Sequence, residues 1–304
     1  MRIVAALGGN ALLRRGEKPD AAVQLAHIAQ AVAALAPLAA EHELLITHGN
    51  GPQVGMLALE TADDHTLSTP YPLDALVAET QGMIGYWLAR ELRAALPERQ
   101  VVTLLSDTLV DPTDPAFNDP TKFIGAQYTA QEAALLTATR GWTMRQDGSA
   151  WRRVVPSPEP RDIVELPAIT HLMDAGWIVV AAGGGGIPVT ANGHHGVEAV
   201  VDKDLTAALL AERTDADALL LLTDVSNIYA DYGTPQARPL TGTTPEEIRA
   251  LGLPEGSMGP KAEAAARFVE HRPGAFAAIG SLTDAEALLT GKAGTHIRSH
   301  GSLH

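Results

Sequence analysis

Ile3-Val4-Ala5-Ala6-Leu7-Gly8-Gly9-Asn10 opens the chain with five apolar residues followed by two glycines and an asparagine. A short apolar run that ends in glycines is typical of a buried β-strand. Amphipathic stretches alternate with further apolar runs along the chain, beginning with a helix expected from residue 19 to about 40. Such alternation predicts an α/β fold, a three-layer α-β-α sandwich around a mostly parallel sheet.

The remaining expected elements follow the same alternation. We expect further strands at residues 44–47, 100–105, 177–182, 218–223, 275–279 and 295–297. We expect further helices at residues 73–96, 165–175, 203–212, 260–270 and 283–289.

Residues 106–160 interrupt this pattern, because they are rich in proline, aspartate and glycine. Gln146-Asp147-Gly148-Ser149 lies between two short apolar segments and predicts a hairpin. An excursion of this length inside a compact fold is usually a lid or a binding element. We therefore expect one domain over residues 1–304, with a small protruding lid subdomain inserted at 106–160.

Composition limits the classes of protein to consider. The 304 residues carry a formal net charge of −14, which disfavours nucleic acid as a partner. The two longest apolar runs considered, residues 177–182 and 218–222, are strand-sized and far below the ~20 residues of a membrane span, and no secretory signal is expected. Because the chain has no cysteine, it has no disulfide and no thiolate metal site. We expect a cytoplasmic protein without a membrane partner.

Three glycine clusters each follow an expected strand: Gly8-Gly9-Asn10, Gly49-Asn50-Gly51 and Gly183–Gly186. Glycines let consecutive backbone N–H groups converge on an anion, and ligands of open α/β sheets bind at the carboxyl ends of strands. Each cluster taken alone would equally be a tight turn. Three clusters at equivalent positions favour a polyphosphate or two anionic groups held side by side.

Several familiar signatures are absent from the sequence. It has no Gly-x-x-x-x-Gly-Lys-Ser/Thr loop, no Gly-x-Gly-x-x-Gly after the first strand, no His-Glu-x-x-His and no nucleophile elbow. These absences disfavour P-loop, dehydrogenase, metalloprotease and serine hydrolase chemistry.

Three of the five lysines occupy unusual positions. Lys203 lies between Asp202 and Asp204 at an expected helix start, Lys261 also lies at a helix start, and Lys122 lies inside the excursion. A helix N-terminus disfavours cations, so two lysines there indicate a transferring phosphoryl group that needs charge stabilisation. Solvated surface lysines are the alternative. Asp202 and Asp204 could hold magnesium, position the lysine, or simply cap the helix.

Together these segments resemble the carbamate kinases of the amino acid kinase superfamily. The resemblance runs from residue 3 to about 297 and rests on Ala6-Leu7-Gly8-Gly9-Asn10-Ala11, His48-Gly49-Asn50-Gly51-Pro52-Gln53-Val54-Gly55, Gln81-Gly82-Met83-Ile84-Gly85-Tyr86, Asp119-Pro120-Thr121-Lys122, Val154-Val155-Pro156-Ser157-Pro158, Gly196-Val197-Glu198-Ala199-Val200-Val201-Asp202-Lys203-Asp204 and Gly256-Ser257-Met258-Gly259-Pro260-Lys261. It implies reversible phosphoryl transfer between ATP and carbamate, with Mg²⁺ accompanying the nucleotide, in a homodimer.

The resemblance also implies roles for residues. Lys122, Lys203 and Lys261 would act on the phosphoryl group, with Asp204 orienting the lysines. The carbamate or carbamoyl phosphate end would bind at Gly8, Gly9, Asn10, Gly49, Asn50 and Gly51. The nucleotide would bind at Gly183, Gly184, Thr223, Asp224, Val225, Tyr229, Met258 and Gly259. No metal ligand of the protein itself is expected.

Two departures from the family pattern occur. Ser226-Asn227 replaces an acid and a small residue, which affects packing on the nucleotide side, and Phe123 replaces a proline, which affects the stiffness of the excursion. Two other functions remain open: a superfamily kinase for another small acid, and a catalytically silent nucleotide-binding module. The shortness of the glycine-rich pocket and the presence of Lys122 disfavour the first, and retention of all three lysines disfavours the second.

Overall fold

The computed structural model describes residues 1–304 except 15, 191–194, 255–257 and 300–304, and the side chain of residue 10 is also left out. Its centre is an eight-stranded sheet in the order β14-β16-β15-β11-β1-β2-β9-β3. The strands are β1 (Arg2–Leu7), β2 (Glu43–His48), β3 (Val101–Thr103), β9 (Ile178–Val180), β11 (Ala218–Thr223), β14 (Gly242–Thr243), β15 (Phe276–Ser281) and β16 (Thr295–Ile297). Pairing is parallel except between β15 and β16, so the predicted mostly parallel sheet is confirmed.

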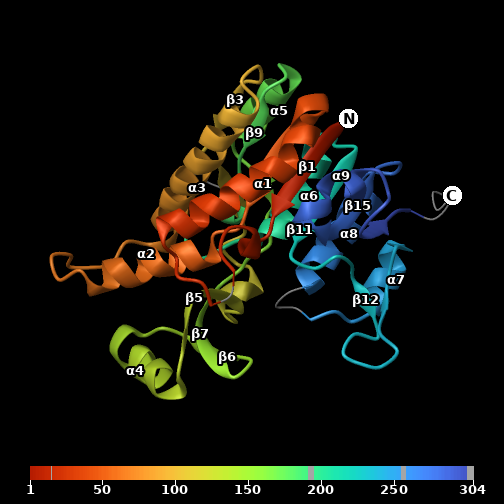
Figure 1. Ribbon diagram of the computed structural model, residues 1–304. Coiled ribbons are helices and arrows are strands. Elements are labelled where there is room, and N and C mark those ends of the chain that lie inside the picture. Colours follow the sequence, from red (N-terminus) through yellow and green to blue (C-terminus); the bar gives the residue numbers. More distant parts are fainter. Residues whose placement is uncertain (15, 191–194, 255–257, 300–304) are drawn as a thin grey trace.

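Helices cover both faces of this sheet (Figure 1). The alternation of side chains along β1 decides which layer each residue joins, because successive residues of a strand point to opposite faces. Ile3 and Leu7 pack in the core beneath α1 (Ala21–Glu41), α3 (Leu73–Ala95) and α9 (Ala285–Leu289), whereas Val4 packs with the opposite layer. That layer contains α5 (Leu166–Asp174), α6 (Lys203–Arg213), α7 (Pro245–Ala250) and α8 (Met258–His271). The predicted three-layer sandwich is therefore confirmed.

Helix α1 is the one helix in the described chain that is long and apolar enough to cross a membrane, by length and composition alone. The expectation that no stretch approaches such a length is therefore wrong for residues 21–41. Ile28, Leu35 and Leu38 of this helix are buried in the core between the helix and the sheet. The apolar length of α1 thus covers one face of the sheet.

Smaller sheets surround the central one. β10 (Ile187–Thr190), β4 (Asp107–Val110) and β8 (Asp162–Ile163) form one, and β12 (Tyr229–Ala230) pairs with β13 (Arg238–Pro239). β5 (Lys122–Tyr128), β7 (Ala150–Val155) and β6 (Met144–Asp147) form the third, against which α4 (Ala130–Arg140) packs. The antiparallel β6–β7 pair is the predicted hairpin.

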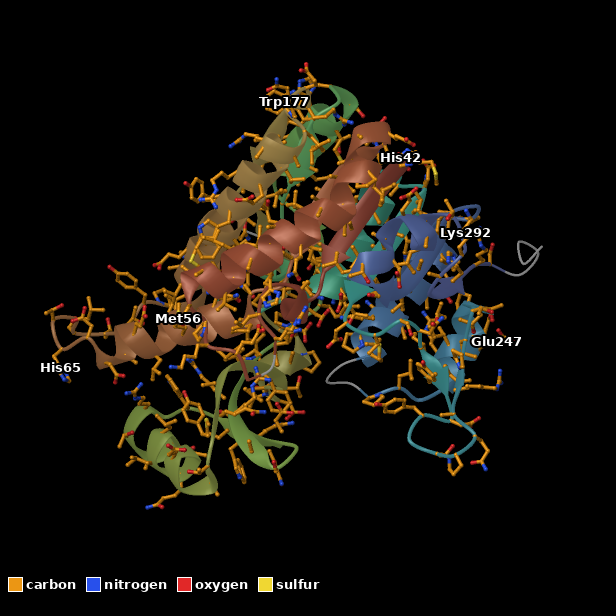
Figure 2. The ribbon with its side chains drawn as sticks, in the orientation of Figure 1. His42, Met56, His65, Trp177, Glu247 and Lys292 are labelled. Atoms are coloured by element: carbon orange, nitrogen blue, oxygen red, sulfur yellow. The ribbon has the colours of Figure 1, made fainter. Side chains whose placement is uncertain are left out.

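The protrusion is narrower than the expected 106–160. β4 pairs with β10 and β8, and the side chain of Gln81 on α3 bonds to the backbone of Ser106, so the first part of the excursion lies against the main body. The projecting part comprises β5, α4, β6 and β7, residues 122–155, and we call it the subdomain (Figure 1). It lies beside α2 (Gly51–Asp63) at the carboxyl edge of the sheet, whereas His42 and Trp177, which precede β2 and β9, lie at the opposite end (Figure 2).

Candidate active site

The loops that follow neighbouring strands place the candidate site at one edge of the sheet. Residue 7 of β1 lies in register with Leu222 of β11 on one side and with His48 of β2 on the other. The loops that follow are joined by backbone hydrogen bonds: Gly8 N–H donates to Leu222 O at 2.9 Å, and Gly49 N–H donates to Leu7 O at 3.0 Å. Because the carboxyl ends of these parallel strands coincide, two of the glycine clusters meet there as predicted.

The glycines at this edge allow backbones to approach closely. A Cβ atom on Gly49 would lie 3.1 Å from the Gly9 nitrogen and 3.4 Å from Cδ of Lys203. A Cβ atom on Gly8 would lie 3.0 Å from Leu222 O. The glycine loops after β1 and β2 therefore run alongside the stem of Lys203. Gly51 begins α2, so the first-turn N–H groups of that helix are directed toward this edge without intrahelical acceptors.

Asp204 joins the two lysines that the sequence places at helix starts. Its Oδ1 accepts a hydrogen bond from Nζ of Lys203 at 2.6 Å, and its Oδ2 accepts one from Nζ of Lys261 at 2.9 Å. All three residues are buried. Lys203 belongs to the first turn of α6 and Lys261 to the first turn of α8, so one carboxylate holds two helix N-termini and two cations together.

Lys122 reaches the same place from the subdomain. Its Nζ donates to Oδ2 of Asp202 at 2.5 Å, while Oδ1 of Asp202 accepts from the backbone N–H groups of Asp204 and Leu205. Asp202 is therefore the N-cap of α6 and also the ion-pair partner of Lys122. The predicted capping role is therefore present, whereas the lysine that Asp202 contacts is Lys122 and not the adjacent Lys203, which pairs with Asp204.

The electrostatics of this cluster follow from burial and from its ion pairs. Burial lowers the pKa of Lys203 to about 8, against the opposing effect of Asp204. Burial alone would raise the pKa of Asp204, but Lys203 and Lys261 hold it well below its usual range. Burial also opposes the charge of Lys261, yet Asp204 raises the pKa of that lysine. The cluster thus keeps an ionised carboxylate between two ammonium groups, of which Lys203 loses its proton first.

Gly183 and Gly184, expected on the nucleotide side, lie elsewhere. Both follow β9, and β9 is separated from β11 by β2 and β1. Cβ atoms on them would clash with the His48 ring and with the Asn50 amide, respectively. The structure thus places these glycines against the loop after β2, where they make room for two polar side chains.

His48 and Asn50 are themselves buried at this place. The Asn50 amide nitrogen donates to Thr80 Oγ1 at 2.9 Å, so its side chain is engaged within the protein. Nδ1 of His48 lies 3.0 Å from Gly49 O, and burial lowers the pKa of this histidine to about 4. Neither His48 nor Thr80 is among the site residues predicted from the sequence. The position of His48 directly before Gly49 is the feature that could have indicated its place in the site.

The other expected nucleotide residues lie at the end of β11 and just after it, in β12, and at the start of α8. Thr223 ends β11 and its hydroxyl donates to Asp224 Oδ1 at 3.1 Å. Tyr229 lies in β12, and Val225 is partly exposed. A Cβ atom on Gly259 would lie 2.9 Å from Pro254 O. The neighbouring residues 256 and 257 lie outside the described part of the chain.

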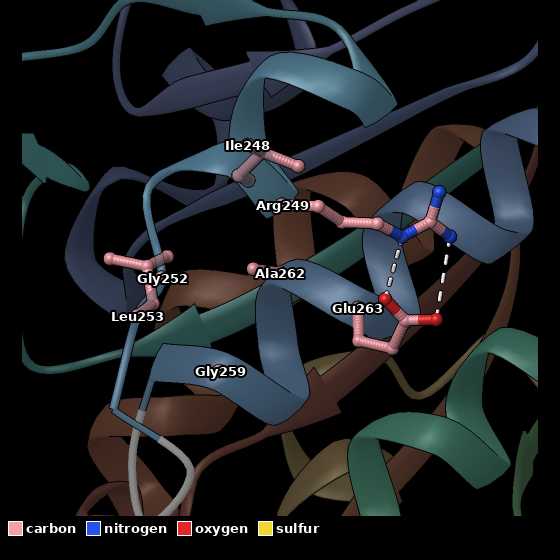
Figure 3. A pocket seen from close by; sticks show the side chains of 7 residues that line it. All are labelled: Ile248, Arg249, Gly252, Leu253, Gly259, Ala262 and Glu263. Atoms are coloured by element: carbon pink, nitrogen blue, oxygen red, sulfur yellow. Dashed lines mark hydrogen bonds and ion pairs between the residues drawn. The ribbon is translucent and has the colours of Figure 1, made fainter.

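A cavity of about 160 Å³ opens beside Gly259, between α7 and α8 (Figure 3). Ile248, Leu253 and Ala262 give it apolar walls, and the ion pair of Arg249 with Glu263 lies at one side. Gly259 is the one expected nucleotide residue among those that line this cavity.

The two departures from the family pattern have structural partners. The Asn227 amide donates to Leu240 O at 3.0 Å, which ties the segment after β11 to the strand region before β14. Phe123 lies in β5 under the guanidinium of Arg152, 5.5 Å from its ring centre. Neither position contributes a charge to the lysine cluster.

Comparison with known proteins identifies the family of the chain. The model of the amino acid kinase family matches residues 1–275. The carbamate kinase of Rhizobium meliloti is 50% identical, with 98% of this chain and 94% of that protein covered, and the carbamate kinase of Escherichia coli K12 is 50% identical with 97% and 98% covered. The carbamate kinase of Giardia lamblia bound to citric acid superposes with a TM-score of 0.91 at 39% identity, covering 98% of both chains. This chain therefore belongs to the amino acid kinase family and groups with its carbamate kinases.

Proposed function

We propose that this protein transfers a phosphoryl group reversibly between ATP and carbamate. In the ATP-forming direction an oxygen of the ADP β-phosphate forms a bond to the phosphorus of carbamoyl phosphate. The P–O bond to the carbamoyl carboxylate breaks, and carbamate leaves and decomposes to ammonia and CO₂. The observation that carries the proposal is the Lys203–Asp204–Lys261 cluster beside the two glycine loops.

The charges of the cluster suit this reaction. Phosphoryl transfer has little covalent chemistry for the protein to perform, so positioning and charge stabilisation dominate. Lys203 and Lys261 would hold the oxygens of the moving phosphoryl group, and Asp204 would position both ammonium groups. Lys122 would add a third positive charge from the subdomain. The loops of Gly8, Gly9 and Asn10 and of Gly49, Asn50 and Gly51 would bind the carbamate end. The N–H groups of Gly9, Asn10, Asn50 and Gly51 would donate to it, because those of Gly8 and Gly49 already donate to Leu222 O and Leu7 O.

We place the nucleotide at Thr223, Asp224, Val225, Tyr229, Met258 and Gly259. We move Gly183 and Gly184 from this set to the support of the substrate loop, because they lie against His48 and Asn50. A carbamate kinase from Giardia lamblia bound to AMP-PNP, 40% identical with a TM-score of 0.88, supports nucleotide binding by this fold.

Mg²⁺ would come with the nucleotide. Within the described residues no group of three or more histidine, cysteine, aspartate or glutamate side chains could hold a metal ion. Asp202 and Asp204 are both engaged by lysines. This donor set fits an ion held mainly by phosphate oxygens and water, whose charge would offset that of the phosphates.

We also propose a homodimer in the cytoplasm. β3 is the last strand of the central sheet, and nearby Tyr86 and Leu105 are 57% and 53% exposed, which supports an interface at that edge. Light scattering on the purified protein tests the dimer, since a monomer mass at micromolar concentration would exclude it.

A coupled assay tests the activity: ATP formed from ADP and carbamoyl phosphate is measured with hexokinase and glucose-6-phosphate dehydrogenase. We expect turnover that depends on both substrates and on Mg²⁺. Lys261→Ala serves as the catalytic control and Lys292→Ala, an exposed lysine, as the matched control. No ATP above the uncatalysed rate with folded wild-type protein would exclude the proposal.

A further inference from the structure

A second cavity, of about 310 Å³, lies where the subdomain meets the main body. Its volume is at the lower end of small-molecule sites, ~300–1,000 Å³. None of the three cluster lysines lines it. The residues that carry the argument are Ala58, Tyr71, Arg140, Trp142, Arg153 and Glu198.

Arg153 is the central cation of this cavity. Its guanidinium lies 4.4 Å from the centre of the Trp142 ring. Its side chain forms no hydrogen bond or ion pair with any described residue, although a guanidinium has five N–H donors. Burial lowers the pKa of Arg153. Arg153 is half-buried and lines the cavity, so an acceptor bound there could use its free N–H donors.

The guanidinium of Arg140 also lies over the Trp142 ring. It lies 5.2 Å from the centre of Trp142, and it forms an ion pair with Asp63. Its Nη1 is buried and has no hydrogen-bond partner. Two arginines thus share one indole, and each has unused donors.

Glu198 is the carboxylate among the lining residues. Its Oε1 accepts a hydrogen bond from the backbone N–H of Leu73 at 3.0 Å. No ion pair joins Glu198 to Arg153 in the described chain, although the charge of Glu198 raises the pKa of that guanidinium. Glu198 therefore favours the charge of Arg153 without occupying its N–H donors.

We infer that this cavity binds a small organic anion whose carboxylate or phosphate oxygens accept hydrogen bonds from Arg153. Trp142 and Tyr71 would contact the rest of the ligand. None of the three cluster lysines lines this cavity, so the site is separate from the proposed substrate site.

The site also connects to the position of Lys122. Arg153 pairs with Ile124 across the β5–β7 ladder, and Lys122 pairs with Val155, two residues further along each strand. Ala58 on the opposite wall belongs to α2 of the main body. An anion bound between them would hold the subdomain against α2, in the position where Lys122 contacts Asp202.

Calorimetric titration of the purified full chain tests the inference, with succinate and inorganic phosphate as separate probes. The variants are Arg153→Met, Arg153→Lys and Glu198→Gln. Arg152→Met is the matched control, because Arg152 is the adjacent residue of β7, bears the same charge, and pairs instead with Asp147 and Phe123. Circular dichroism and the thermal midpoint establish that each variant is folded.

We expect Arg153→Met to weaken binding of at least one probe by about 10-fold or more, the loss typical of a charge-assisted contact. Arg153→Lys should weaken it less, Arg152→Met should change Kd by less than about 2-fold, and Glu198→Gln should tighten binding. Phosphate can also bind at the lysine cluster, and that part should survive in Arg153→Met. Unchanged affinity in Arg153→Met, equal loss in Arg152→Met, or no binding of either probe to wild-type protein at millimolar concentration would each overturn the inference.

Discussion

Asp204 and Lys261 are 57 residues apart in the chain, yet Nζ of Lys261 lies 2.9 Å from Oδ2 of Asp204. The other oxygen of the same carboxylate accepts from Lys203 at 2.6 Å. A single carboxylate therefore fixes the separation of two ammonium groups that start different helices. Because all three groups are buried, the position of the charges depends on this residue more than on solvent.

Replacing Asp204 by asparagine should separate positioning from binding. Asp204→Asn keeps the side-chain shape but removes the charge between two buried cations. We expect kcat to fall by about 10²–10³-fold, as for other groups that organise charge around a transition state, with the nucleotide Kd changed only a few fold. Steady-state kinetics and nucleotide titration give the two numbers.

Asp215→Asn is the matched control for that variant, because Asp215 forms an exposed ion pair with Arg272. It should leave kcat unchanged, since exposed pairs contribute ~0–1 kcal/mol to stability. If Asp204→Asn raises the nucleotide Kd as much as it lowers kcat, Asp204 serves binding and not the transition state.

Activity should decline at alkaline pH because of Lys203. Burial lowers its pKa to about 8, and kcat/KM reports the ionisation of the free enzyme. We expect kcat/KM to fall about 10-fold per pH unit above a pH near 8, as Lys203 loses the charge that the phosphoryl group requires. Lys203→Arg should be slower but flat from pH 7 to 10, because arginine stays protonated.

Unfolding at alkaline pH would also lower kcat/KM, but the effect of Lys203 on folding stability has the opposite dependence on pH. The folded pKa of Lys203 lies below its unfolded value of about 10.5. The unfolded chain therefore binds more protons between pH 8 and 10.5, so the contribution of Lys203 to stability rises with pH in that window. A kcat/KM that stays constant to pH 10 in folded protein would show that Lys203 acts as the neutral amine or does not act.

Much of the fold could be predicted from the sequence because its central strands are continuous apolar runs buried on both faces, as residues 3–7 and 218–222 are. The expected elements do not include α2, because Gly51-Pro52 is typical of a turn after a strand, although proline is also common at a helix start. Helix α4 was also missed inside the excursion, although its Thr129–Glu132 capping box was a readable signal.

The candidate site was less predictable, because its contacts depend on distant parts of the chain. Helix-start positions identified Lys203 and Lys261, but only the packing of α6 against α8 brings them to one carboxylate. Gly183 and Gly184 resembled an anion loop in sequence, while their lack of Cβ atoms serves the packing of His48 and Asn50. A glycine's role depends on its neighbours in space, which local sequence does not give.

Adding one methyl group at Gly55 should disturb the contact between the subdomain and α2. A Cβ on Gly55 would lie 2.0 Å from Cα of Gly125 in β5, so Gly55→Ala must push the two backbones apart. Since β5 also carries Lys122, we expect kcat/KM to fall at least about 10-fold, an effect typical of displaced reactive groups. Glu60→Ala, an exposed change on the same helix, should change it by less than 2-fold.

Hydrogen exchange gives the accompanying measurement for Gly55→Ala. Amides of β5 and β7 should exchange faster in this variant than in wild-type protein, while those of β1 should not change. Loss of protection across the whole chain would mean global destabilisation, and normal kinetics would mean that the position of the subdomain does not matter for turnover.

The acceptor site should be large enough for carbamate and too small for longer acids. A second carboxylate would need its own cation, and a longer side chain would need apolar walls. The segments around the ends of β1 and β2 offer glycine, asparagine and histidine, and the first arginine after β1 is the exposed Arg14. Close contact of Gly49 with Gly9 and Lys203 leaves little room between them. Carbamate has few atoms, and efficient small ligands gain at most ~1.5 kcal/mol per heavy atom, so its affinity must be modest. We expect ATP formation from carbamoyl phosphate and ADP. In the opposite direction, with ATP and each acid at equal concentration, we expect little ADP release with acetylglutamate, glutamate or aspartate compared with carbamate. Acetylglutamate phosphorylated as fast as carbamate would refute the small pocket, whatever the family of the chain.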